Sequence, residues 1–240
     1  MCVVIGYFAS THKLEHKNIL FRLFTESKIR GLHAFGVHTG KTTLKSNNLK
    51  KITQFIEKFN GKRLIGHTRY STSGDFRVES NNQPIFREDL ALVFNGVIDM
   101  GTKQEMESSH QISLETENDG EIFAQHLSLG GDPVQFVKQV KFSLAALWAK
   151  GKKIFGVRNN KRPLWGCKAE GAVFISSTAD IFKRSGLQNC FPLEPFTVYD
   201  LGRVLNGEQE TGIHSISYVN DERWGYRPRT PLSTLRQQQI

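Results

Sequence analysis

Eight short apolar runs, each rich in β-branched and aromatic residues, set the strongest limit on how this chain can fold. They cover residues 2–8, 33–39, 63–69, 90–96, 153–158, 171–177, 196–201 and 213–219. Runs of this length and composition are typical of β-strands. Four longer segments instead repeat apolar residues at helical spacing, namely 12–30, 47–61, 119–131 and 132–151. The sequence therefore predicts a mixed chain with many strands and a few helices.

The last of the predicted helices has a recognisable beginning and end. Asp132 is suited to cap a helix and Pro133 to occupy its first turn. Gly151 is suited to end it. We therefore expect one helix from residue 132 to residue 151.

Length and composition describe an ordinary globular protein. The chain has 240 residues, of which 38% are hydrophobic and 23% charged, enough for one large domain or two small ones. No apolar run reaches the roughly 18 residues of a bilayer span, and the start lacks the layout of a secretion signal. We expect a cytoplasmic protein without membrane contact. The three cysteines are far apart in sequence with no C-x-x-C pair, so neither a zinc ribbon nor a disulfide framework is expected. We expect no metal and no cofactor.

The chain is basic, with a net charge of +9 and a pI near 9.5. Lysines and arginines concentrate in segments 41–63 and 150–168 and in the last 20 residues. Such a charge favours an anionic partner, such as nucleic acid, a phosphorylated metabolite or an acidic protein surface. It also serves solubility alone, and no nucleic-acid-binding motif accompanies it. Both interpretations stay open.

Several polar residues stand where strands begin or end. They are Cys2 after the initiator Met1, Arg69 in "GHTRYSTSG", Asn95 and Gly96 in "FNGVIDM", and Asp119 in "ENDGEIFAQHL". Taken singly, each has a plain structural interpretation. Cysteine is a frequent core residue, arginine a surface charge, Asn-Gly a hairpin turn and aspartate a helix cap.

Taken together and in order, these blocks resemble the glutaminase domain of class II glutamine amidotransferases, which are N-terminal nucleophile hydrolases. The further blocks are "RGLHAFGVHTG", "NNQPIF", "GVRNNKRPLWG" and "VFISSTADIF". "RYSTSG" with a following Gln-Pro looks most like the amidophosphoribosyltransferase version. The resemblance implies an α+β fold, a four-layer αββα sandwich of two stacked antiparallel sheets. It would cover residues 1–201, and residues 202–240 would form a tail that packs on the domain or docks a partner.

The resemblance also assigns roles to the polar residues. Cys2 would be the nucleophile, and its α-amine, freed by removal of Met1, would be the base. Asn95 and Gly96 would donate hydrogen bonds to the oxyanion. Arg69 would pair with the α-carboxylate of L-glutamine and Asp119 with its α-ammonium, with Tyr70 and Thr72 also binding substrate. No separate catalytic histidine is needed, and His67, on a predicted buried strand, is expected to be a core residue.

Three positions depart from the family pattern. Ser73 stands where many members carry histidine, Phe94 replaces the residue that often precedes Asn-Gly, and Gly120 replaces a threonine. None of these changes removes a group that thioester chemistry needs. They do make the details of glutamine binding less transferable than the nucleophile.

The resulting hypothesis is a stand-alone enzyme that hydrolyses glutamine and passes ammonia to an acceptor on a separate synthetase, in nucleotide or DNA base modification. No P-loop, phosphoribosyl-binding motif or sugar-isomerase region is found in the sequence. One alternative is another N-terminal nucleophile amidohydrolase that acts on a peptide or acyl amide. A second is a non-catalytic module that binds nucleic acid through the basic surface.

Overall fold

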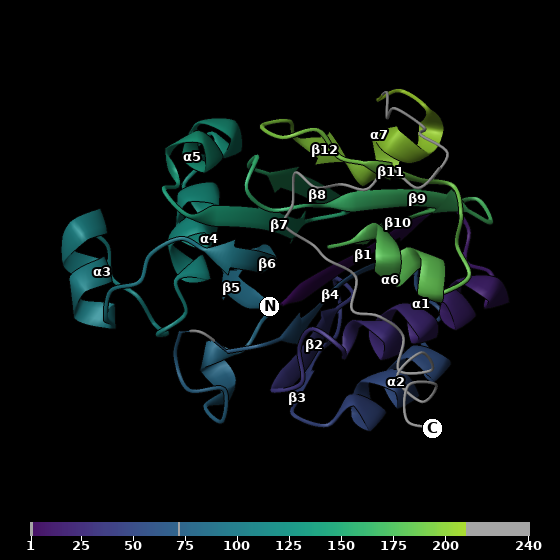
Figure 1. Ribbon diagram of the computed structural model, residues 1–240, viewed down its shortest axis with the longest axis horizontal. Coiled ribbons are helices and arrows are strands. Elements are labelled where there is room, and N and C mark those ends of the chain that lie inside the picture. Colours follow the sequence, from purple (N-terminus) through teal and green to yellow (C-terminus); the bar gives the residue numbers. More distant parts are fainter. Residues whose placement is uncertain (1, 72, 210–240) are drawn as a thin grey trace, which may run out of the picture.

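The chain folds into two antiparallel sheets with helices on their outer faces (Figure 1). The computed structural model describes residues 2–71 and 73–209. The strands are β1 (Val3–Ala9), β2 (Ala34–His38), β3 (Thr43–Ser46), β4 (Arg63–Arg69), β5 (Ile85–Arg87), β6 (Leu90–Val97), β7 (Ser143–Lys150), β8 (Lys153–Arg158), β9 (Trp165–Ala169), β10 (Ala172–Ser176), β11 (Cys190–Pro192) and β12 (Tyr199–Asp200). The helices are α1 (Leu14–Ser27), α2 (Leu49–Lys58), α3 (Lys103–His110), α4 (Gly120–Ser128), α5 (Pro133–Gln139), α6 (Ala179–Arg184) and α7 (Leu201–Asn206).

The large sheet has the strand order β11-β9-β10-β1-β4-β2-β3, and the small sheet has the order β12-β8-β7-β6-β5. All paired strands run antiparallel. β1 therefore lies in the middle of the large sheet, between β4 and β10. The first residues of β1, which follow Cys2, are thus held by a strand on each side.

Three apolar layers separate four layers of secondary structure. Between the sheets lie buried side chains that include Val4, Ile65, Val93, Ala145 and Ile175. Helices α1, α2 and α6 pack on the outer face of the large sheet, and α4 and α5 pack on that of the small sheet. The predicted α+β sandwich with αββα layers is confirmed. Because both faces of each sheet are buried, the central strands are apolar at nearly every position.

The structure contradicts the predicted helix over residues 132–151. Asp132 does cap α5, where its carboxylate accepts from the backbone N–H of Val134 at 2.7 Å. The helix ends at Gln139, however, and strand β7 follows from Ser143. β7 is central in the small sheet, between β6 and β8. Its residues are buried on both faces, and such a continuous apolar run cannot be distinguished from a buried helix by periodicity.

The end of the chain is only partly described. The predicted strand-like run at 213–219 and most of the predicted tail lie outside the described residues. α7 extends across the predicted boundary at residue 201 and packs against β1 and β8. The division into residues 1–201 and 202–240 stays a proposal. None of the described helices combines the length and apolar character that crossing a bilayer requires.

Antiparallel pairing brings several strand ends to one edge of the sandwich, which we call the site edge. β1 begins there, and β4, β6 and β10 end there. Val3 is paired with Thr68, and Ile5 with Ser176. Residues of even number on β1 face the other sheet, as Val4 does, and odd positions such as Val3 face the helices. Cys2 therefore begins the row that points between the sheets.

His67 is buried just inside the site edge, as the sequence predicts for a core residue. It is 1% exposed and is paired with Val4 across β1 and β4. Burial lowers the pKa of His67 to about 3, and the nearby Arg69 charge acts in the same direction, against a smaller opposing effect of a hydrogen bond with the Phe94 backbone. The folded protein therefore holds this imidazole neutral.

A pH-dependent loss of stability follows from this burial. Because the folded-state pKa lies below the ordinary value of about 6.5, the unfolded state binds more protons, and stability is lost as pH falls below 6.5. Between pH 7 and pH 5, His67 should account for about 2 kcal/mol of the lost free energy of unfolding. Denaturant titrations of wild type and His67→Gln at both pH values measure this contribution. Equal pH dependence in the two proteins would show the contribution to be absent.

Candidate active site

The thiol of Cys2 lies against the backbone at the end of β4. Its Sγ is 3.4 Å from the carbonyl oxygen of Tyr70, to which it donates, and 3.4 Å from the Tyr70 nitrogen, from which it accepts. Cys2 itself is half-buried. The nucleophile predicted from the sequence thus stands at the site edge, beside the segment "RYSTSG".

The surroundings of Cys2 act on its acidity in opposite directions. Burial raises the pKa of the Cys2 thiol, while the Tyr70 N–H and the charges of Arg69 and Arg162 lower it. Burial is the larger effect. A thiol in this position remains protonated near neutral pH, so nucleophilic attack requires a base that takes its proton.

Asn95 and Gly96 lie within strand β6 and do not form a hairpin turn. They are paired with Ala145 and Leu144 of β7. A Cβ on residue 96 would lie 2.0 Å from the carbonyl oxygen of Ser143, so only glycine fits beside that strand. The hairpin interpretation of Asn-Gly is wrong. Both predicted oxyanion donors lie at the end of β6.

A buried hydroxyl joins Asn95 to the strand that carries Cys2. The Ser177 Oγ accepts from the backbone N–H of Val4 at 2.9 Å and from the Asn95 Nδ2 at 3.4 Å. Asn95 is 2% exposed, and Ser177 is fully buried. The side-chain amide of Asn95 therefore lies against the first residues of β1.

Arg69, the last residue of β4, is also buried, with 3% of its surface exposed. Its guanidinium donates to the Asn82 Oδ1 at 2.5 Å, to the Gly74 carbonyl at 3.2 Å and to the Ser73 carbonyl. The interpretation of Arg69 as a surface charge is wrong. In this structure its donors bind oxygens of the chain itself.

Asp119 stands before α4 but its side chain does not cap that helix. Its Oδ2 accepts from the backbone N–H of Ile98 at 2.6 Å, and its Oδ1 accepts from the Ser73 hydroxyl at 3.2 Å. Burial raises the pKa of the Asp119 carboxyl, and these hydrogen bonds act against that rise. The capping role belongs to Asn118, whose side chain accepts from the Gly120 N–H at 3.0 Å.

Ser73 connects the two residues predicted to bind glutamine. Its carbonyl accepts from Arg69 and its hydroxyl donates to Asp119. The Ser73 carbonyl thus occupies the place on Arg69 that is predicted for the α-carboxylate of glutamine. The Ser73 hydroxyl occupies the place on Asp119 that is predicted for the α-ammonium. Arg69 and Asp119 are therefore spaced so that one small group with an acceptor and a donor can bridge them.

The other two predicted substrate-binding residues contribute less to this arrangement. Thr72 lies outside the described residues. The Tyr70 ring is 48% exposed and stacks on His33, with the ring centroids 4.7 Å apart. On its other side His33 stacks on Phe76 at 4.8 Å. What Tyr70 offers at Cys2 is its backbone.

Sequence reasoning assigned no role to several residues that build the site. Asn82 binds Arg69 and also donates to the Phe76 carbonyl at 2.7 Å. The neighbouring Gln83 accepts from the Phe94 N–H at 2.6 Å, which fixes β6 just before Asn95. Both lie in "NNQPIF", where a run of buried amides before proline was the available signal. Ser177 gave no signal of its own.

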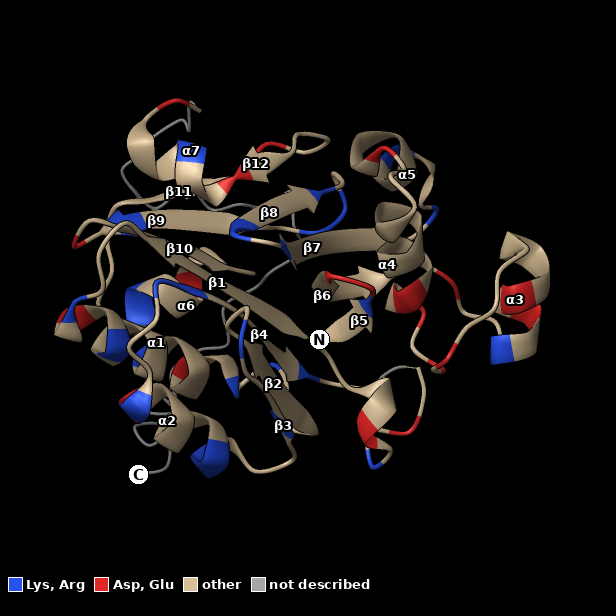
Figure 2. Ribbon diagram, turned by 180° about the vertical axis from the view of Figure 1, so that it is seen from behind, with Lys and Arg blue, Asp and Glu red and all other residues tan. Residues whose placement is uncertain are grey.

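Arg162 lies near Cys2 without having been predicted there. Its Nη2 and Nε donate to the Ser143 Oγ at 2.8 and 3.1 Å, and its charge acts on the Cys2 thiol. The basic segment 150–168 is therefore not one surface. β8 spans about 17 Å between Lys153 and Arg158, and Figure 2 shows basic residues in the loops at both of its ends.

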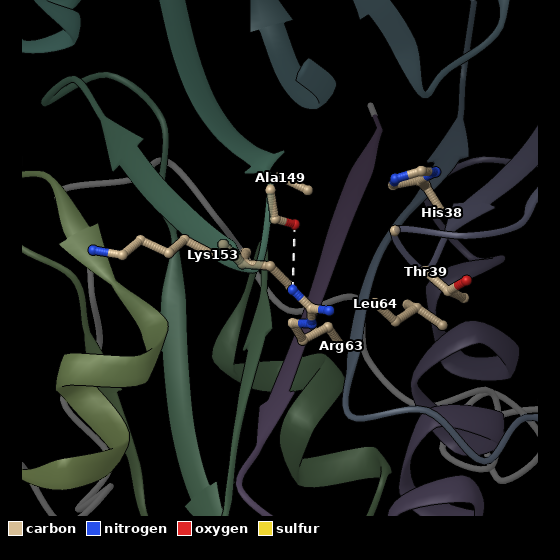
Figure 3. A pocket seen from close by; sticks show the side chains of 9 residues that line it. His38, Thr39, Arg63, Leu64, Ala149 and Lys153 are labelled. Carbon is tan, nitrogen blue, oxygen red and sulfur yellow. Dashed lines mark hydrogen bonds between the residues drawn. The ribbon is translucent and has the colours of Figure 1, made fainter. Parts of the chain in front are cut away.

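Two cavities lie elsewhere. The one drawn in Figure 3 lies between His38, Arg63 and Lys153, where β4 and β8 begin, and holds about 10 Å³, room for no more than one water. A larger one of about 410 Å³ lies between α3 and the loop after α5, beside Asp99 and Phe142. Neither is lined by Cys2, Arg69 or Asp119.

Two of the departures from the family pattern fit each other. A Cβ on Gly120 would lie 2.0 Å from the Cε1 of Phe94. The phenyl ring, 3% exposed on the outer face of β6, thus fills the space that a side chain at the start of α4 would need. The glycine at position 120 and the phenylalanine at position 94 therefore belong to one packing arrangement.

Comparisons with known proteins show which sequences and structures this chain is similar to. No family model matches the chain. It is 28% identical over 201 residues to the glutamine–fructose-6-phosphate aminotransferase (isomerizing) of Helicobacter pylori strain J99, covering 75% of this chain and 33% of that protein. With the Bacillus licheniformis enzyme of the same name it shares 26% over 183 residues, or 68% and 30% of the two chains. The match thus spans about a third of the length of these relatives.

Solved structures extend the likeness to the fold. The glutamine phosphoribosylpyrophosphate amidotransferase of B. subtilis superimposes with a TM-score of 0.64, at 21% identity over 81% of this chain and 46% of that chain. A structure described as the allosteric regulatory enzyme of purine biosynthesis gives 0.61, at 20% identity over 83% and 48%.

In sequence and in fold the chain is similar to class II glutamine amidotransferase domains. The relatives with similar sequence and those with similar structure carry different acceptor chemistries in their names. Glutamine appears in the names of the two aminotransferases and of the B. subtilis enzyme, but fructose 6-phosphate and phosphoribosylpyrophosphate do not appear together in any of them, so no acceptor is transferred to this chain.

The contact between Phe94 and Gly120 can be tested by a mutant cycle. Gly120→Thr should destabilise the protein by about 2–3 kcal/mol, because the new side chain collides with the ring. Phe94→Cys combined with Gly120→Thr should recover most of this loss, and denaturant unfolding of the four proteins measures the coupling energy. Strictly additive effects would contradict the proposed packing relation.

Proposed function

We propose that this chain hydrolyses L-glutamine to glutamate and ammonia through a thioester on Cys2. The observation that supports this most directly is the position of the Cys2 thiol at the site edge, 3.4 Å from the Tyr70 backbone at the end of β4. Asn95 is joined to the same strand through Ser177. A nucleophile and an oxyanion donor are the minimum that amide hydrolysis by thioester requires.

The first half of the reaction forms the thioester. Once Met1 is removed, the α-amine of Cys2 takes the thiol proton, and Sγ bonds to the side-chain amide carbon of glutamine. The carbonyl oxygen becomes an oxyanion, which accepts hydrogen bonds from the Asn95 Nδ2 and the Gly96 N–H. The carbon–nitrogen bond then breaks, and the proton passes from the amine to the departing nitrogen, so that ammonia leaves.

The second half returns the enzyme. Water loses a proton to the same amine and attacks the thioester carbon, and the carbon–sulfur bond breaks. Glutamate leaves, and the sulfur recovers its proton. Because burial raises the pKa of the Cys2 thiol, the scheme needs a base, and an ordinary α-amine, with a pKa of about 7.7–8.0, is partly unprotonated near neutral pH and can take that role.

Glutamine recognition rests on Arg69 and Asp119. In the proposal the substrate α-carboxylate replaces the Ser73 carbonyl on Arg69, and the α-ammonium replaces the Ser73 hydroxyl on Asp119. Both exchanges substitute a charged partner for a neutral one, which strengthens each hydrogen bond. An amide without α-groups gains nothing from this exchange, and this distinguishes glutamine from a peptide or acyl amide.

The fate of the ammonia is the finer part of the proposal. We propose delivery to an acceptor on a separate synthetase, in nucleotide or DNA base modification. It draws support from the amidotransferase class of the fold and from the net charge of +9, which suits an anionic partner. Co-purification of a synthetase with the full chain, and glutamine-dependent amination by the pair, tests it.

Substitution of the nucleophile is the first test. Cys2→Ala should lower glutamine hydrolysis by at least about 10³-fold, because no thioester can form. Intact mass should show that Met1 is absent from active protein, and an electrophilic glutamine analogue should label Cys2. Cys167→Ala is the matched control, since Cys167 is buried on the face of the large sheet that packs against the helices. Full glutaminase activity of Cys2→Ala would refute the mechanism.

The second test concerns the α-ammonium. Asp119→Asn should raise the KM for glutamine about 10- to 100-fold, because one charged hydrogen bond is lost. The same variant should lose most of the preference for glutamine over glutaramate, which lacks the α-ammonium. Asp180→Asn, which removes an exposed carboxylate paired with Arg184, serves as control. An unchanged preference in Asp119→Asn would remove Asp119 from the binding site.

A further inference from the structure

Ser177 occupies the junction between the two parts of the proposed reaction centre. It follows β10, is fully buried, and belongs to the block "VFISSTADIF", to which no role has been given. The last pair of the β1–β10 ladder is Ile5 with Ser176. The Val4 N–H lies just beyond that pair, and the Ser177 hydroxyl accepts its hydrogen bond at 2.9 Å.

The same hydroxyl accepts from the Asn95 Nδ2 at 3.4 Å. A carboxamide rotates easily about its last side-chain torsion, and an oxyanion donor must stand within a few tenths of an ångström of its working position. Nδ2 carries two hydrogens. A hydrogen bond from one of them to Ser177 fixes the plane of the amide and leaves the other free to point at the reacting oxygen.

We infer that Ser177 is a positioning residue that orients the Asn95 amide relative to the strand carrying Cys2. The inference rests on the proposed glutaminase function. Ser177 does not touch glutamine in this scheme. It acts through Asn95, since one oxygen binds the Asn95 side chain and the β1 backbone at once.

The chain provides a matched control at the preceding position. Ser176 is also a fully buried serine, and its Oγ has no hydrogen-bond partner among the described residues. Removal of either hydroxyl creates a similar small cavity in adjacent residues. Only the loss of the Ser177 hydroxyl releases Asn95.

The experiment compares Ser177→Ala and Ser176→Ala in the full chain. Ser177→Ala should lower kcat for glutamine about 10- to 100-fold with KM nearly unchanged, and Ser176→Ala should stay within about twofold of wild type. Alkylation of Cys2 by iodoacetamide forms no oxyanion, so its rate should be the same in all three proteins. In an Asn95→Ala background, Ser177→Ala should have no further effect on kcat, because its target is already gone.

Each outcome decides one question. A wild-type chain without Met1 that fails to hydrolyse glutamine overturns the proposed function and this inference with it. If wild type is active, the inference alone is overturned when Ser177→Ala keeps more than half of kcat, when its loss multiplies with that of Asn95→Ala, or when Cys2 alkylation slows as much as turnover. Should Ser177→Ala not fold, as judged by thermal unfolding, Ser177→Cys offers a weaker acceptor for the same comparison, with alkylation located by peptide mass.

Discussion

The packing of the two sheets against each other determines which side chains of the central strands face the interior of the sandwich. Val4, Ile65, Val93 and Ala145 are all fully or almost fully buried between the sheets, and their alternation fixes which side chains of β1, β4 and β6 face inward. A slip of one residue in any of these strands would turn its inward row toward the helices. Cys2, Arg69 and Asn95 share the inward rows, so the packing that stabilises the domain also brings these three side chains to one edge.

In the structure Ser73 occupies the space between Arg69 and Asp119, where the substrate is proposed to bind. Arg69 and Asp119 are buried polar groups, and each would be costly to leave without hydrogen bonds. Ser73 satisfies part of both. Under the proposed function, glutamine binding is an exchange of partners, in which charged hydrogen bonds replace neutral ones.

The sequence could predict strands β1, β2, β4, β6, β8 and β10, because burial on both faces leaves a clear apolar pattern. The layers followed from the family resemblance and not from that pattern. The short strands β3, β5, β9 and β11 were not predicted, and Cys2 as nucleophile stays a proposal. The prediction of one helix over residues 132–151 is wrong for a related reason. Its second half is apolar at nearly every position, and the pattern fits a buried helix as well as β7. Asn95 shows the opposite case. Asn-Gly usually marks a turn, yet Asn95 and Gly96 also end the predicted strand-like run 90–96, and the pairing with β7 decides for the strand.

The sequence could not predict residues that contribute only by holding another residue in position. Ser177, Asn82 and Gln83 matter through the groups they touch, and those groups are up to 173 positions away in the chain. A serine in a strand-like run has no local property that separates it from its neighbour Ser176. Arg162 is similar, since it lies among other basic residues and only the fold brings its charge close to Cys2.

The fit between Phe94 and Gly120 limits how this domain can diverge from its relatives. A threonine introduced at position 120 collides with the Phe94 ring, and a smaller residue introduced at position 94 leaves a cavity. Either substitution alone therefore gives a less stable protein. A change from phenylalanine at 94 with glycine at 120 to a smaller residue at 94 with threonine at 120 therefore needs both substitutions in close succession. The pair should therefore be inherited together, and redesign that borrows residues from a relative should transplant both positions at once.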